Sequence, residues 1–132
     1  MPPDPSMLMA QANAANGQAD QKDSAAQQLR VEGDAVAHRV DFVMKEIRSD
    51  VWTGGAARTC RKESDDRAGQ LRRISDHLHG WADVAHRTAG QLRQQAATCQ
   101  QNANAVAQWQ AACQAARAAV PPQPDPPPPP GV

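Results

Sequence analysis

The sequence predicts an all-α fold, an antiparallel hairpin of two amphipathic helices. Alanine, glutamine and arginine favour helices, while the chain has one Phe and no Tyr. Apolar residues recur every three or four positions in two runs, and the adjacent glycines Gly54 and Gly55 separate these runs. The 40% hydrophobic share comes largely from alanine, so the expected core is thin and a lone monomer marginally stable.

The first element is predicted to be a helix over residues 24–50, preceded by a flexible arm over residues 1–22. The arm contains several prolines and many small polar residues. Ser24 and Gln27 have the spacing of a capping box, which marks a helix start. The apolar face of this helix comprises Leu29, Val36, Val40, Val43 and Ile47, with Gly33 on the same face.

A turn over residues 51–55 is expected next, followed by a second helix over residues 56–90. Gly54 and Gly55 allow the backbone reversal, and Trp52 precedes them. The apolar positions of the second helix again recur at spacings of three and four: Leu71, Ile74, Leu78, Trp81 and Leu92. The predicted interface, within the hairpin or with a partner, comprises these five residues with Val36, Val40, Val43 and Ile47.

The remainder of the chain allows two arrangements of one helical segment and ends in a proline-rich tail. Residues 91–119 continue the same heptad phase, so they either extend the second helix or fold back as a third helix after a break near Gly90. The helical domain thus spans residues 23–119. Residues 120–132 are mostly proline and predict extended polyproline II structure, either a spacer or a docking tail.

Neither a catalytic site nor a cofactor or metal site is expected. Cys60, Cys99 and Cys113 form no CxxC pair and have no histidine at zinc-finger spacing, so buried free thiols are predicted. His79 and His86 share a helical ridge with Asp83, which fits a solvated outer face. A weaker alternative is a metal-regulated or redox-sensing protein that uses these histidines and the cysteines. The sequence contains no phosphate-binding loop or nucleophile elbow, and a two-helix hairpin offers little concave volume. We therefore expect a non-enzymatic protein.

Charge and hydropathy restrict the partners. Net charge is zero, which gives no reason to expect nucleic acid. Residues 1–51 carry 5 basic and 8 acidic side chains, whereas residues 52–119 carry 9 basic and 5 acidic, so the two halves are complementary. We expect neither a Sec-type signal peptide nor a stable membrane span, because no long uninterrupted apolar run occurs.

The turn also carries a family resemblance. Trp52-Thr53-Gly54, followed by Ala56-Ala57, lies between the two helical runs. This arrangement resembles the WXG family of ESAT-like type VII secretion substrates over about residues 24–95. The resemblance implies a helical hairpin that forms a homo- or heterodimeric four-helix bundle with another WXG-like hairpin. It also implies contact with the ATPase of the secretion machinery, directly or through the partner.

The resemblance further implies where the protein goes. It would be cytoplasmic before export, and then secreted or held at the cell surface by a route that uses no signal peptide. The family's export signal is a Tyr followed four positions later by an acidic residue; this chain has no Tyr, so a partner would carry the signal for both. The alternative function is a cytoplasmic coiled-coil adaptor or structural protein whose proline-rich tail docks a partner.

Overall fold

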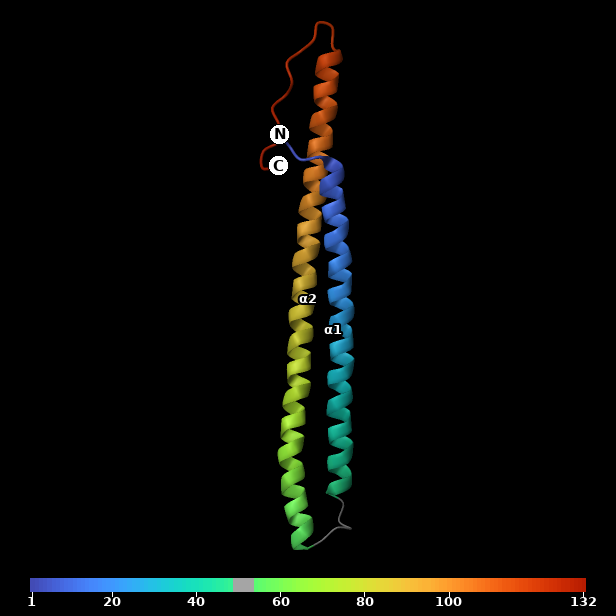
Figure 1. The fold of residues 1–132 in the computed structure, drawn as a ribbon, viewed down its shortest axis with the longest axis vertical. Helices are drawn as coiled ribbons and strands as arrows, with labels where there is room; N and C mark the ends of the chain where they lie inside the picture. The colour runs from blue at the N-terminus through green and yellow to red at the C-terminus, as the bar shows by residue number, and fades with distance from the viewer. Residues whose placement is uncertain (49–53) are drawn as a thin grey trace. The chain divides into compact units, whose positions relative to one another are not determined.

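The computed structural model describes residues 1–48 and 54–132 and contains two helices there. They are α1, Pro5–Ile47, and α2, Gly55–Ala118. The described residues contain no β-strand, and the two helices pack against each other (Figure 1). The predicted all-α class and helical-hairpin form are therefore confirmed.

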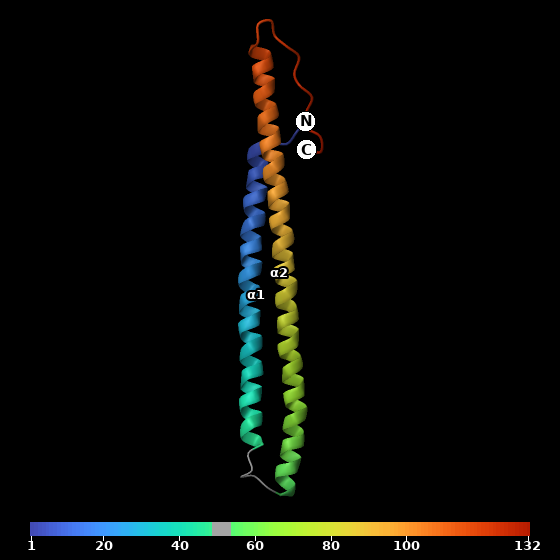
Figure 2. The ribbon, with the colours of Figure 1, turned by 180° about the vertical axis from the view of Figure 1, so that it is seen from behind.

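The chain divides into two compact units. The central unit comprises residues 22–87, and the terminal unit comprises residues 1–21 and 88–132. In each unit a stretch of α1 lies beside a stretch of α2 and runs antiparallel to it, as the views from both sides show (Figure 1 and Figure 2).

The helix begins much earlier than the sequence patterns indicated. Asp4 caps α1, because its carboxylate accepts a hydrogen bond from the Ser6 backbone N–H at 2.9 Å. Pro5 occupies the first helical position, where the missing N–H costs nothing. This capping bond also holds the pKa of the Asp4 carboxyl below its ordinary value. The prediction of a flexible arm over residues 1–22 was wrong, and Ser24 lies inside the helix.

Of the two arrangements left open for residues 91–119, the structure shows the extension of the second helix, since α2 continues without interruption to Ala118. A glycine in a helix costs about 1 kcal/mol relative to alanine, which tertiary packing readily offsets. The packing comes from the start of α1: in the terminal unit Ala12 and Ala19 are fully buried, as is Ala89, and Ala96 is 1% exposed. A single cause therefore explains both the helical N-terminus and the uninterrupted α2.

The predicted turn is only partly described. Trp52 lies outside the described residues. Gly54 has φ = 106°, a conformation that glycine adopts without strain, and α2 begins at the next residue. The Gly54 carbonyl accepts a hydrogen bond from the Arg58 N–H at 3.1 Å, which closes the first turn of α2.

The helices meet through small residues spaced seven apart, which we call the small-residue seam. In the central unit the seam comprises Ala26, Gly33 and Val40 on α1 with Ala68, Ser75 and Ala82 on α2. In the terminal unit it comprises Ala12 and Ala19 with Ala89, Ala96 and Ala103. Side chains this small allow the two helix axes to approach closely.

Candidate protein-interaction surface

The register of the central unit is fixed by a contact at Gly33. The hydroxyl of Ser75 donates a hydrogen bond to the Gly33 carbonyl at 2.8 Å, and Ser75 is buried. A Cβ built on Gly33 would lie 3.3 Å from the Ser75 carbonyl oxygen, so the two backbones nearly touch. Steps of seven residues from this contact lead to Val40 with Ala68, which pack in one cluster, and to Ala26 with Ala82.

The seam divides the exterior of the central unit into two flanks. Residues three and four positions after a seam residue project to opposite sides, because an α-helix turns 100° per residue. On α1, Val36 and Val43 follow the seam by three positions, whereas Arg30 follows it by four. The same rule on α2 separates Leu71 from Arg72. Each helix therefore places apolar side chains on one flank and charged side chains on the other.

One side, the polar flank, is lined with paired charged and histidine side chains. The pairs are Arg48–Asp65 at 2.8 Å, Arg72–Asp41 at 3.3 Å, His79–Asp34 at 3.1 Å, Arg30–Asp83 at 3.4 Å and His86–Asp23 at 3.0 Å. Four of the pairs join α1 to α2, and the fifth joins Arg48, the residue after α1, to α2. Exposed pairs of this kind contribute at most about 1 kcal/mol each, but together they favour one register of the two helices.

The polar flank also accounts for the histidine ridge. His79 and His86 contact carboxylates of α1, and Asp83 contacts Arg30, so all three side chains of the ridge have partners across the hairpin. Among the described residues, no group of three or more His, Cys, Asp or Glu side chains is placed to hold a metal ion. The ridge thus makes contacts across the hairpin while Asp83 and His86 remain exposed to solvent.

The other side, the apolar flank, carries most of the predicted interface residues, and the structure leaves them largely uncovered. Val43 and Ile74 are each 50% exposed, Leu71 is 43% exposed and Trp81 is 60% exposed. Val36, Ile47 and Leu78 are half-buried. Of the predicted set in the central unit, only Val40 is buried, because it belongs to the seam. Leu92 is half-buried and lies in the terminal unit.

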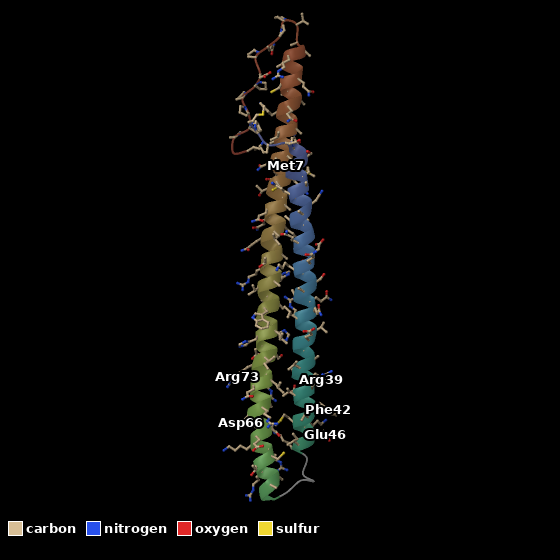
Figure 3. All side chains as sticks on the ribbon, in the orientation of Figure 1. Met7, Arg39, Phe42, Glu46, Asp66 and Arg73 are labelled. Atoms are coloured by element: carbon tan, nitrogen blue, oxygen red, sulfur yellow. The ribbon has the colours of Figure 1, made fainter. Side chains whose placement is uncertain are left out.

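The apolar flank contains a groove between α1 and α2. Its volume is about 460 Å³. It is lined by Val36, Val40, Val43, Met44 and Ile47 from α1, and by Ala68 and Leu71 from α2, with Arg39, Ser64 and Arg67. Charged side chains also project outward from the two helices, among them Arg39 and Glu46 of α1 and Asp66 and Arg73 of α2 (Figure 3). An apolar groove with a charged border suits a protein partner.

Sequence reasoning found the larger apolar residues but missed the seam and the polar flank. The signal for the seam was small residues at intervals of seven, as in Ala12, Ala19, Ala26 and Gly33. The signal for the polar flank was acidic residues at the same interval, as in Asp34 and Asp41. Both repeats are visible in the sequence, but neither raises the hydrophobicity on which helix-face assignment depends.

The cysteines show varied environments in the described part of the chain. All three are free thiols: Cys60 and Cys99 are half-buried, and Cys113 is buried with 6% exposure. The predicted free thiols are thus observed, although only Cys113 is fully buried. In the described residues, neither helix is long and apolar enough to cross a membrane.

Comparison of the chain with protein-family models, with curated proteins and with solved structures gives no match.

Proposed function

We propose that this chain is a non-enzymatic helical hairpin that pairs with a second helical hairpin through its apolar flank. The difference between the two flanks carries the proposal. The polar flank is satisfied within the chain by five cross-helix pairs, whereas the apolar flank leaves Val43, Leu71, Ile74 and Trp81 at least 43% exposed. Large exposed apolar patches on soluble proteins mark interaction surfaces.

A second copy of this chain is the partner that we propose first. Each helix carries a ridge of apolar side chains at heptad spacing. A two-fold axis would place these two ridges against the same two ridges of a second copy. Burial of these side chains between two hairpins would contribute roughly 1.5–3 kcal/mol for each Val, Leu or Ile that is fully covered. The product would be a four-helix bundle.

The test is the mass of the protein in solution after a charge is placed on the apolar flank. Sedimentation equilibrium of the wild-type chain should give twice the 14.1 kDa chain mass. Ile74→Glu should weaken the dimer by at least about a hundredfold, because each unpaired charge in an interface costs roughly 3 kcal/mol and the dimer would carry two. Ile74 is 50% exposed, so the hairpin itself should tolerate the change.

The matched control is Val31→Glu. Val31 is 61% exposed and lies on α1 among the polar residues Ser24, Gln27 and Glu32, away from the apolar flank. This variant should retain the wild-type dimer mass. A wild-type chain that remains monomeric at 100 µM, or an unchanged dimer in Ile74→Glu, would rule out self-pairing through this face.

We further propose that the hairpin is exported by a type VII secretion system. The support is the Trp52-Thr53-Gly54 triplet between two helical segments, together with the pairing surface that such substrates require. The experiment compares culture medium from the native host with medium from the same host lacking the secretion ATPase, with a cytoplasmic marker as a lysis control. Loss of the extracellular protein on ATPase deletion is expected. Retention in the cytoplasm of both strains would favour the coiled-coil adaptor instead.

A further inference from the structure

The proline-rich tail is bound to the chain itself. In the terminal unit α1 begins at Pro5 and Leu8 packs with Ala103 and Val106, whereas α2 continues to Ala118. The tail turns back beside this last part of α2 (Figure 1). The reversal is held by the Gln123 N–H, which donates to the Ala116 carbonyl at 2.9 Å. The last residue of the tail, Val132, packs against the Leu8–Val106 cluster.

Two polar contacts attach the middle of the tail to one ridge of α2. The indole N–H of Trp109 donates a hydrogen bond to the Pro126 carbonyl at 2.9 Å. The Arg117 guanidinium donates to both carboxylate oxygens of Asp125, with Nε at 2.9 Å from Oδ1. A bidentate pair of this kind is directional as well as attractive.

Cys113 lies between these two contacts, and its burial shows that the ridge is covered. Trp109, Cys113 and Arg117 follow one another at four-residue intervals, so they share a face of α2. Tail residues contact the side chains on either side of Cys113, and Cys113 is only 6% exposed. The thiol is therefore a reporter of tail docking.

We propose that the C-terminal end of α2 is a binding site for an extended proline-rich peptide with an acidic residue, and that the chain's own tail is its displaceable resident ligand. The chemistry of each contact matches such a peptide. Proline residues have no N–H, so a proline-rich segment presents carbonyl acceptors without competing donors, and the Trp109 indole supplies a donor. Arg117 recognises the single acidic side chain of the segment. An aromatic side chain beside an apolar surface is the usual receptor for polyproline II segments.

The first experiment uses the full-length chain with Asp125→Arg, which places two like charges together without altering the helix. Site-resolved mass spectrometry measures the alkylation rates of Cys113 and of half-buried Cys99 as an internal reference. The variant should increase the Cys113 rate about tenfold, since local opening controls access to a buried group. It should also shift the Trp109 indole N–H signal in the ¹H–¹⁵N spectrum, assigned by Trp109→Phe.

Gln123→Arg is the matched control for this variant. It introduces the same arginine side chain two residues away and leaves Asp125 in place, and Gln123 contributes a backbone contact rather than a side-chain contact. The control should behave like the wild-type chain. The double variant Arg117→Asp with Asp125→Arg should restore protection of Cys113, because the reversed pair has the same geometry. Unchanged Cys113 and Trp109 signals in Asp125→Arg would overturn the proposal.

The second experiment tests recognition in trans. A synthetic peptide of residues 120–132 is titrated to 1 mM, a concentration at which roughly millimolar affinities are detectable, into the full-length Asp125→Arg chain. It should return the Trp109 signal to its wild-type position and protect Cys113 again, whereas the same peptide with Asp125→Arg should do neither. Failure of the native-sequence peptide to act would overturn the peptide-site assignment and leave the tail as a covalently tethered structural element only.

Discussion

The close approach of the two helices at Gly33 makes a quantitative prediction. A Cβ added at Gly33 would lie 3.0 Å from Nε2 and 3.1 Å from Cδ2 of His79, and 3.3 Å from the Ser75 carbonyl oxygen. The His79 ring can rotate away, but that movement weakens its 3.1 Å contact with Asp34. The Ser75 carbonyl cannot rotate away, because it belongs to the backbone of α2. The helices must therefore separate by a few tenths of an ångström.

Two effects of Gly33→Ala compete. Replacing a helical glycine with alanine stabilises a helix by about 0.8–1 kcal/mol. Overpacking of a tight contact costs about 1–3 kcal/mol. We therefore expect Gly33→Ala to change the free energy of unfolding by between zero and about −2 kcal/mol, the negative sign meaning a less stable chain.

Gly80→Ala provides the matched control in the same unit. A Cβ built on Gly80 meets no described atom within 4 Å, and the residue is exposed on α2. The free energy of unfolding of this variant should rise by the full difference in helix propensity, about 0.8–1 kcal/mol. Urea denaturation followed by circular dichroism at 222 nm, at one fixed protein concentration, gives both free energies. Equal stabilisation by Gly33→Ala and Gly80→Ala would refute the tight seam.

Three further predictions follow from the seam, the polar flank and the tail. Ala82→Leu should destabilise the chain by about 1–3 kcal/mol because Ala82 is fully buried, whereas Leu at exposed Ala25 should change stability by less than about 0.5 kcal/mol, both measured by urea denaturation. Asp41→Asn should cost less than about 1 kcal/mol at low salt, and the cost should disappear in 1 M NaCl; a salt-independent loss would contradict an exposed ion pair. The arginine beside Asp125 holds the pKa of that carboxyl below its ordinary value, so tail docking should persist at neutral and mildly acidic pH and be lost as pH falls through the lowered pKa. The Trp109 indole signal recorded from pH 7 downward checks this, and a transition above the ordinary Asp pKa would contradict it.

The sequence predicts the larger part of the fold for identifiable reasons. Helix-forming composition and two runs of three-and-four spacing predict two helices, and α2 begins at Gly55, directly after Gly54. The error at the N-terminus has an identifiable origin. Proline and small polar residues before Ser24 suggested disorder, yet Asp4 and Pro5 are a favourable cap and first position, and Ala12 and Ala19 supply a packing face.

The sequence identified the apolar residues of the candidate surface, but it did not show where they lie relative to the contact between the helices. Val36, Val43, Leu71, Ile74 and Trp81 were expected on an interface because they are the large apolar side chains at heptad spacing. Hydrophobicity could not show that the helices would meet beside them, through Ala26, Gly33 and Ala82. That choice depends on tertiary geometry, because small residues allow close backbone contact and a hydrogen bond such as that from Ser75 to Gly33.

The close helix–helix contact and the exposed apolar flank have one physical cause. A seam of alanine, glycine and serine brings the helix backbones close together, but a buried alanine removes little more than one methyl group from water, about 0.8 kcal/mol, against roughly 1.5–3 kcal/mol for a buried Leu or Ile. Apart from Val40 and Met44, few larger side chains of the central unit are buried between the helices, and several of them lie on the apolar flank, while paired charged residues line the other flank. A hairpin built in this way has a weak core of its own and an exposed apolar face whose burial stabilises it further. The proposed pairing with a second hairpin would supply burial that the isolated chain lacks.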